Sequence, residues 1–254
     1  MKTRGEKITM LTAYDATMAA LFDRAGMDVL LIGDSLGMTI LGHPNTLQVT
    51  LEDVIRHTQA VRRGAARALL VADMPFLTYQ VSVPEAVRNA GRLLQEGGAA
   101  AVKLEGGEPV LDVVERLVSL GIPVMGHLGL LPQSVHQQGG FKRQATTERA
   151  RKQLLADAAA LENAGACAVV LECIPSDLAQ ETSAALKIPT IGIGSGPHCD
   201  GQVLVSYDLL GLTAEAPPFA RQYADLGNTI LAAVRAYYDD VKQGGFPRDR
   251  AANA

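Results

Sequence analysis

The segment LLIGDSLGMTILGH, residues 30–43, joins an apolar run to an acid, a hydroxyl and a glycine. Its first half has the composition of a buried β-strand. Asp34 and Ser35 follow directly, so a carboxylate stands at the end of a segment that reads as protein core. Such an acid either caps a turn or serves chemistry. If it serves chemistry, other strands of the chain should end in the same way.

Short apolar runs alternate with longer segments of helical period along the whole chain. Eight runs read as strands: KITMLTAYD (7–15), DVLLIGD (28–34), ALLVADMP (68–75), AAVKLEGG (100–107), IPVMGHLG (122–129), CAVVLECIP (167–175), IPTIGIGSG (188–196) and QVLVSYD (202–208). Helical segments such as LEDVIRHTQAVRRGA (51–65) and ERARKQLLADAAALENAGA (148–166) lie between them. Eight such units without a linker favour a single (β/α)8 TIM barrel in the α/β class.

We expect one barrel domain over residues 1–254, with a C-terminal helix at about 217–243 and a frayed tail. One connection departs from the repeat. PHCDG, residues 197–201, is too short to supply a full helix between the seventh and eighth strands.

Composition narrows the class of partner. The 254 residues carry a formal charge of −4, with 4% aromatic residues and no Trp, which argues against nucleic acid. No apolar run is long enough to span a bilayer, so we expect no membrane partner. The first residues do not resemble a secretory signal, and the three cysteines form neither a disulfide framework nor a C-x-x-C pair. We therefore expect a cytoplasmic protein that acts on small-molecule substrates.

Polar side chains stand at the carboxyl ends of the expected strands, where barrel enzymes build their active sites. They are Asp15, Asp34, Ser35, Asp73, Lys103, Glu105, His127 and Glu172. Any one acid is about as often the cap of a helix. Acids that share one barrel mouth, however, would repel each other and raise each other's pKa unless a cation were present. Magnesium prefers oxygen ligands, so Asp34, Asp73 and Glu105 are candidate Mg²⁺ ligands, and zinc is the second choice.

Four of these side chains suggest further roles. Lys103 and Glu105 lie two residues apart on one face of a strand, where Lys103 could hold an anionic substrate. His127 is either a hydrogen-bonded structural histidine or a substrate contact. Glu172 ends an apolar run, so burial should raise its pKa and suit it to act as a general base. Surface ion pairs are the alternative for the lysine and both glutamates.

Nine segments together resemble one enzyme family, in order, from about residue 8 to about residue 245. They are TAYDA, GDSLGMTILGH, TLQVTLEDVIRHTQAVRRGA, ADMPF, VKLEGGE, PVMGHLGLLPQSV, LECIP, IPTIGIGSG and DGQVLVSYDLLG. The combination resembles the 3-methyl-2-oxobutanoate hydroxymethyltransferase family, also called ketopantoate hydroxymethyltransferases. The resemblance implies a (β/α)8 barrel, a cytoplasmic enzyme of pantothenate biosynthesis, and a homo-oligomer, specifically a homodecamer.

The resemblance also implies a reaction and its residues. A hydroxymethyl group passes from 5,10-methylenetetrahydrofolate to 3-methyl-2-oxobutanoate through a magnesium-stabilised enolate, giving 2-dehydropantoate and tetrahydrofolate. The implied metal ligands are Asp34, Asp73 and Glu105. The implied keto-acid contacts are Asp34, Ser35, Asp73 and Lys103, and the implied proton acceptor is Glu172.

Two other function classes are alternatives. A magnesium-dependent lyase or mutase of the phosphoenolpyruvate mutase and isocitrate lyase type would share the barrel, the metal and the enolate. Such an enzyme would be expected to carry a KKCGH-like cysteine loop, and this sequence contains none. A non-enzymatic ligand-binding barrel would have no use for the base that we expect at Glu172.

Overall fold

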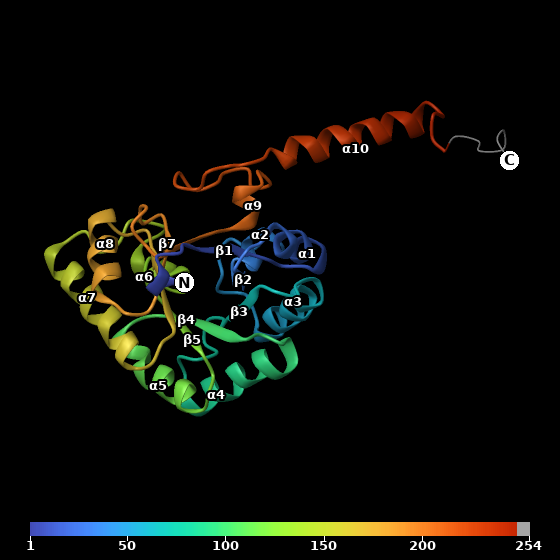
Figure 1. Ribbon diagram of the computed structural model, residues 1–254. Coiled ribbons are helices and arrows are strands. Elements are labelled where there is room, and N and C mark those ends of the chain that lie inside the picture. The colour runs from blue at the N-terminus through green and yellow to red at the C-terminus, as the bar shows by residue number, and fades with distance from the viewer. Residues whose placement is uncertain (248–254) are drawn as a thin grey trace. The chain divides into compact units, whose positions relative to one another are not determined.

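Eight parallel strands close into a barrel in the order of the sequence, which confirms the expected (β/α)8 fold. Figure 1 shows the helices around the strands. The structure is a computed structural model, and it describes residues 1–247. Its strands are β1 (Ile8–Thr12), β2 (Val29–Ile32), β3 (Leu69–Asp73), β4 (Ala101–Glu105), β5 (Val124–Gly129), β6 (Ala168–Glu172), β7 (Thr190–Ile193) and β8 (Gly201–Leu204). Pairing of β1 with β8 closes the sheet, so the carboxyl ends of all eight strands form one rim.

Helices cover the outside of this barrel: α1 (Ala16–Ala25), α3 (Leu51–Gly64), α4 (Val83–Arg92), α5 (Leu111–Ser119), α7 (Glu148–Asn163) and α8 (Ser176–Ala185). Two shorter helices, α2 (Leu36–Thr39) and α6 (Val135–Gln138), belong to the connections after β2 and β5. Short helical turns extend three of the connections: η2 (Leu93–Gly97), η3 (Glu108–Val110) and η4 (Pro132–Ser134). Local capping explains where several helices begin. In α3, for example, Thr50 accepts a hydrogen bond from the Asp53 amide while the Asp53 side chain accepts one from the Thr50 amide.

An apolar core fills the barrel interior below the rim. Its buried side chains come from all eight strands: Met10, Val29, Leu31, Val71, Ala101, Met125, Ala168, Val170, Ile191 and Val203. Successive side chains of a strand point to opposite faces, so inward positions recur every second residue. Residues two places after a core side chain therefore also point into the barrel, but at its rim.

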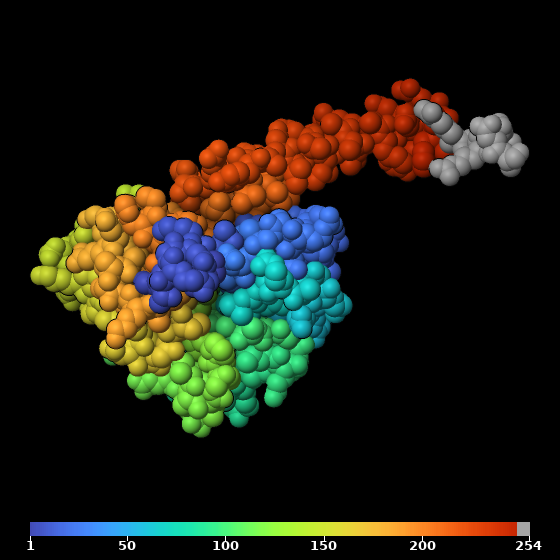
Figure 2. All heavy atoms as spheres, viewed as in Figure 1, coloured from blue at the N-terminus to red at the C-terminus, as the bar shows by residue number. Residues whose placement is uncertain are grey.

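The last crossover and the N-terminal segment differ from the regular repeat. No helix lies between β7 and β8, as the short PHCDG connection predicted. The N-terminal turn η1 (Lys2–Arg4) lies against these two strands, because Lys2 donates hydrogen bonds to the carbonyls of Ser183 and Ile188 and to Asp200. In the space-filling view these first residues, in dark blue, lie over orange residues of that region (Figure 2).

The chain divides into two compact units, Met1–Val205 and Ser206–Ala254, and the barrel is the first of them. In the second unit, α9 spans Ser206–Leu209 and α10 spans Leu226–Lys242. The expected helix at about 217–243 therefore begins later than predicted, because Asp225 caps its first turn and the residues from 217 to 225 are not helical.

We expected one domain over residues 1–254. That the second unit belongs to the same domain as the barrel stays a prediction. The expected tail includes residues 248–254, which lie outside the described residues. Within residues 1–247, no helix combines the length and apolar character needed to cross a bilayer.

Candidate active site

Strand alternation brings the predicted polar side chains to the barrel rim. Val71 lies in the core, so Asp73 points inward two residues later, and Ala101 is followed in the same way by Lys103. Strand register then sets the neighbours. Asp73 pairs with Lys103 across β3 and β4, and Glu105 pairs with His127 across β4 and β5. These four side chains are buried, so Lys103 and Glu105 are not a surface ion pair.

Asp34 and Ser35 follow β2 and reach the same rim. The Asp34 amide donates a hydrogen bond to Asp73 Oδ2 at 3.0 Å, which ties the ends of β2 and β3 together. Ser35 begins α2 without capping it, and its hydroxyl lies 2.9 Å from the Tyr14 hydroxyl. Asp15 behaves differently, because its side chain caps α1 by accepting a hydrogen bond from the Met18 amide.

Lys103 is a buried cation surrounded by acids. Its Nζ lies 2.9 Å from Asp73 Oδ1 and 3.2 Å from His127 Nδ1. Burial would lower the pKa of Lys103, but the nearby carboxylates of Asp73 and Glu105 outweigh it and raise the pKa above its usual value. The lysine is therefore charged at neutral pH and offsets part of the negative charge at the rim.

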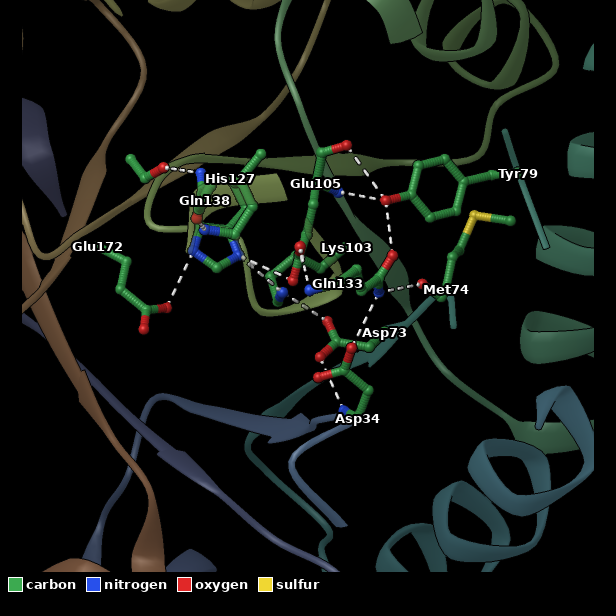
Figure 3. Close-up of polar contacts among 12 residues, drawn as sticks. Asp34, Asp73, Met74, Tyr79, Lys103, Glu105, His127, Gln133, Gln138 and Glu172 are labelled. Atoms are coloured by element: carbon green, nitrogen blue, oxygen red, sulfur yellow. Dashed lines mark hydrogen bonds and ion pairs between the residues drawn. The ribbon is translucent and has the colours of Figure 1, made fainter. Parts of the chain in front are cut away.

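His127 connects Lys103 to Glu172, and Figure 3 shows these two groups on opposite sides of its ring. Burial, and then the charge of Lys103, hold the pKa of His127 well below its usual value, so the ring is neutral. An ammonium group can only donate, so Nδ1 must accept from Lys103 and Nε2 must carry the proton. That Nε2 lies 3.1 Å from Glu172 Oε2, within ion-pair distance although without the alignment of a good hydrogen bond.

Glu172 is the last residue of β6 and is largely buried, with 14% of its side chain exposed at the rim. Burial raises the pKa of Glu172 to about 7, and the charge of Lys103 opposes this rise. Close approach of β5 helps to hold it, because the Leu130 amide donates to the Glu172 carbonyl at 2.9 Å. Gly129 makes this approach possible, since its φ is +97° and a Cβ there would overlap the Glu172 carbonyl oxygen. A carboxyl group that titrates near neutral pH can accept a proton under physiological conditions.

Asp34 and Glu105 show the electrostatic conflict that the sequence predicted. Burial raises the pKa of both carboxyls, and repulsion between the acids adds to the effect. Glu105 Oε1 is buried without a hydrogen bond, and His127 Nδ1, which lies 3.6 Å from it, already accepts from Lys103. An unsatisfied buried carboxylate oxygen beside other acids suits a hard cation.

The acids do not form a closed metal cage by themselves. Within residues 1–247, no three Asp, Glu, His or Cys side chains surround a common point closely enough to enclose a metal ion. Magnesium does not require such a cage, since it usually takes one or two carboxylates and completes its shell with water and substrate oxygens. The donor set therefore fits Mg²⁺ and does not fit a fully protein-coordinated metal such as structural zinc.

The sequence analysis missed two residues of this cluster. Gln133 and Tyr79 are both buried, and Gln133 contacts Asp34 and Glu105 directly. They lie in the loops after β5 and β3, so no strand or helix period distinguishes them from other loop residues. Their position after the carboxyl ends of barrel strands was the one signal that could have found them.

Solved structures with the same architecture support the fold. A phosphonopyruvate hydrolase in complex with oxalate and Mg²⁺ aligns with a TM-score of 0.65 and 13% identity, covering 99% of this chain and 88% of its own. A 2,3-dimethylmalate lyase of the phosphoenolpyruvate mutase and isocitrate lyase superfamily aligns with a TM-score of 0.60 and 17% identity, with the same two coverages. At these identities the likeness concerns the barrel fold.

Sequence comparison is more specific. A family model described as ketopantoate hydroxymethyltransferase matches residues 1–249. A 3-methyl-2-oxobutanoate hydroxymethyltransferase of Moorella thermoacetica is 58% identical over 248 residues, covering 97% of this chain and 92% of its own. One of Chlorobium phaeobacteroides is 57% identical over 254 residues, with 98% and 92% covered. The chain therefore belongs to the ketopantoate hydroxymethyltransferase family and is an enzyme of the transferase class.

Proposed function

We propose that this enzyme transfers a hydroxymethyl group from 5,10-methylenetetrahydrofolate to 3-methyl-2-oxobutanoate, giving 2-dehydropantoate and tetrahydrofolate. Membership of the family supports the overall reaction. The observation that carries the mechanism is the buried Glu172 carboxylate, whose pKa is raised by burial to about 7 at the rim of the barrel. A base is needed at this place because the reaction begins with removal of a proton from the carbon next to the ketone.

Glu172 would take the proton from C3 of the keto acid and leave an enolate. His127 is neutral, and its Nε2 lies 3.1 Å from Glu172 Oε2. The proton on Nε2 would help to keep the carboxylate oriented. C3 would then bond to the methylene carbon as the bond from that carbon to one folate nitrogen breaks. Water would displace the second folate nitrogen and supply the hydroxyl oxygen, and the C3 proton and one proton of water would pass to the two nitrogens of the departing tetrahydrofolate. A positioned general base of this kind contributes roughly 10²–10⁴-fold to a rate.

Lys103 and Ser35 would hold the carboxylate of the keto acid. An ammonium group has three donors, and the two directed at Asp73 and His127 leave one for substrate. Asp34, Asp73 and Glu105 would hold a magnesium ion, with Asp34 and Asp73 also next to the keto acid. When bound, that ion would supply positive charge beside the keto oxygen as negative charge develops there.

An assay with purified enzyme tests this proposal. The keto acid and 5,10-methylenetetrahydrofolate are incubated with Mg²⁺ or with EDTA, and 2-dehydropantoate is measured by mass spectrometry. We expect product only with both substrates and the metal ion. Exchange of the C3 hydrogen in D2O, measured without folate, isolates the proton-removal step. Absence of product from the complete mixture would refute the assignment.

The same assay distinguishes the lyase or mutase alternative. An enzyme of that type would cleave a longer acid without folate, whereas we expect no cleavage. A cytoplasmic location and a homo-oligomeric state, a homodecamer by resemblance, remain parts of the proposal. Light scattering on the purified full chain measures the second of these.

A further inference from the structure

The side chain of Gln133 lies at the centre of the acid cluster and has every hydrogen-bonding position of its amide occupied. Nε2 donates to Asp34 Oδ2 and to the Met74 carbonyl, each at 2.9 Å. Oε1 accepts from the Tyr79 hydroxyl at 2.9 Å and from Gln80 Nε2 at 3.2 Å. Figure 3 shows the amide between Tyr79 and Asp34. Both donors and the acceptor oxygen of this buried amide therefore have partners, as a side chain that fixes its neighbours requires.

These partners permit only one orientation of the Gln133 amide. The Met74 carbonyl can only accept a hydrogen bond, so the NH₂ group must face it, and Asp34 Oδ2 lies against the same NH₂ group. A flipped amide would bring its oxygen against two acceptors and leave Gln80 Nε2 facing another donor. Gln133 therefore presents a fixed donor to Asp34.

The backbone of the same residue binds a second acid. The Gln133 amide N–H donates to Glu105 Oε2 at 3.0 Å. Gln133 thus donates hydrogen bonds to one oxygen of Asp34, which follows β2, and to one oxygen of Glu105, which lies on β4. The other oxygen of Glu105, Oε1, is the buried one that has no hydrogen bond.

We propose that Gln133 is a positioning residue that orients the Asp34 and Glu105 carboxylates for a divalent cation. By binding one oxygen of each acid, it leaves the opposite oxygen available to the cation. A neutral amide suits this task because it fixes a carboxylate without adding a positive charge that would compete with the metal. The inference rests on the proposed function, since that function supplies the cation.

Gln138 provides a matched control in the same connection after β5. Its Oε1 accepts from the Leu131 amide at 3.0 Å and its Nε2 donates to the Gly129 carbonyl at 3.1 Å. Both contacts are to backbone, so this second glutamine holds the loop and touches no acid. Gln138→Met and Gln133→Met remove the same side-chain amide from two positions of one connection, and only Gln133→Met removes it from an acid, Asp34, while the backbone contact with Glu105 remains.

The experiment measures metal binding by the full chain without substrate. Mn²⁺ affinity and the spectrum of bound Mn²⁺ are followed by electron paramagnetic resonance, and Mg²⁺ affinity by calorimetry. Loss of a side chain that orients metal ligands costs about 10–100-fold in metal affinity. We expect a loss of about that size and an altered bound Mn²⁺ spectrum for Gln133→Met. For Gln138→Met we expect an unchanged spectrum and an affinity within about twofold of the wild type.

Each other result has a defined meaning. Equal Mn²⁺ affinity and spectra for Gln133→Met and the wild type would overturn the positioning role, as would equal losses in both variants. A wild type that binds neither ion would overturn the inference together with the metal site of the proposed function. Metal binding with the expected Gln133 dependence, but no hydroxymethyl transfer, would support the inference and refute the proposed reaction.

A second variant serves if Gln133→Met does not fold. Tyr79→Phe keeps Gln133 but removes a hydroxyl that contacts both Gln133 Oε1 and the backbone of Glu105, so it loosens Gln133 and one of the two acids together. We expect a smaller loss of Mn²⁺ affinity in the same direction, with an altered spectrum of the bound ion. Unchanged affinity and spectrum in a folded Tyr79→Phe enzyme would contradict the inference.

Discussion

Replacing Glu172 with glutamine should make the enzyme slower and, at alkaline pH, more stable. Burial raises the pKa of Glu172 from an ordinary 4.5 to about 7. That difference means that keeping the side chain ionised inside the folded protein costs about 3 kcal/mol. Glutamine has nearly the same shape and no charge, so Glu172→Gln should increase the free energy of unfolding by up to about 3 kcal/mol at pH 8.

The gain in stability should depend on pH in one direction. Between pH 4.5 and about 7 the folded wild type holds a proton on Glu172 that the unfolded chain releases. Wild-type stability therefore falls, relative to the variant, as the pH rises through this range. Above pH 7 the difference is constant, and near pH 4.5 it should shrink to about 0.5 kcal/mol or less.

Activity should change in the opposite sense. Loss of a positioned base lowers turnover by roughly 10²–10⁴-fold. Wild-type kcat/KM should rise with pH through a midpoint near 7, because the base acts only when ionised. The variant should retain its Mg²⁺ affinity, since Glu172 is not one of the proposed ligands.

Urea unfolding in EDTA at pH 8 and pH 4.5 measures the stability effect, and C3 deuterium exchange measures the base. Glu115→Gln is the control, because it removes the same charge from an exposed position of α5 and should change stability by less than about 0.5 kcal/mol. If Glu172→Gln is no more stable than the wild type at pH 8, the desolvation reasoning fails. If its C3 exchange is nearly normal, Glu172 is not the base.

Three further substitutions test other parts of the site. Asp73→Asn should raise the Mg²⁺ concentration that gives half-maximal initial rate, and an unchanged requirement would remove Asp73 from the ligand set. Lys103→Met should lower the free energy of unfolding by about 3–5 kcal/mol, because it leaves buried acids without their cation. It should also raise the KM for the keto acid. A loss of stability below about 1 kcal/mol in urea unfolding would contradict the role of Lys103 as their cation. Gly129→Ala should destabilise by more than about 1 kcal/mol and lower kcat by displacing Glu172, whereas Gly140→Ala, with a similar positive φ but open space, should leave kcat unchanged.

Several features of the fold follow from local patterns in the sequence. The apolar runs and their alternation with helical segments predicted all eight strands and the barrel. Capping chemistry at Thr50 and Asp53 agrees with the start of α3. The start of the C-terminal helix was predicted less accurately. The Asp225 cap decides where α10 begins, and the expected helix began at about residue 217.

The neighbours of the site residues could not be predicted from the sequence. His127 was open between a structural role and a substrate contact, because a period of two places it on the inner face without naming its neighbours. The register of β4, β5 and β6 decides those neighbours, and it brings Lys103 and Glu172 to opposite ring nitrogens. Gln133 stayed unnoticed because it belongs to a loop, and a loop residue finds its partners only after the barrel has closed.

The sequence by itself determined which side chains point inward at the strand ends, since that depends on the two-residue alternation of each strand. Only the tertiary structure decided that Asp34, Asp73 and Glu105 share one buried space with Lys103, because strand register and barrel closure set distances between residues remote along the chain. Burial then follows from the packing around these residues, and burial raises the pKa of Asp34, Glu105 and Glu172 and makes Glu172 a candidate base.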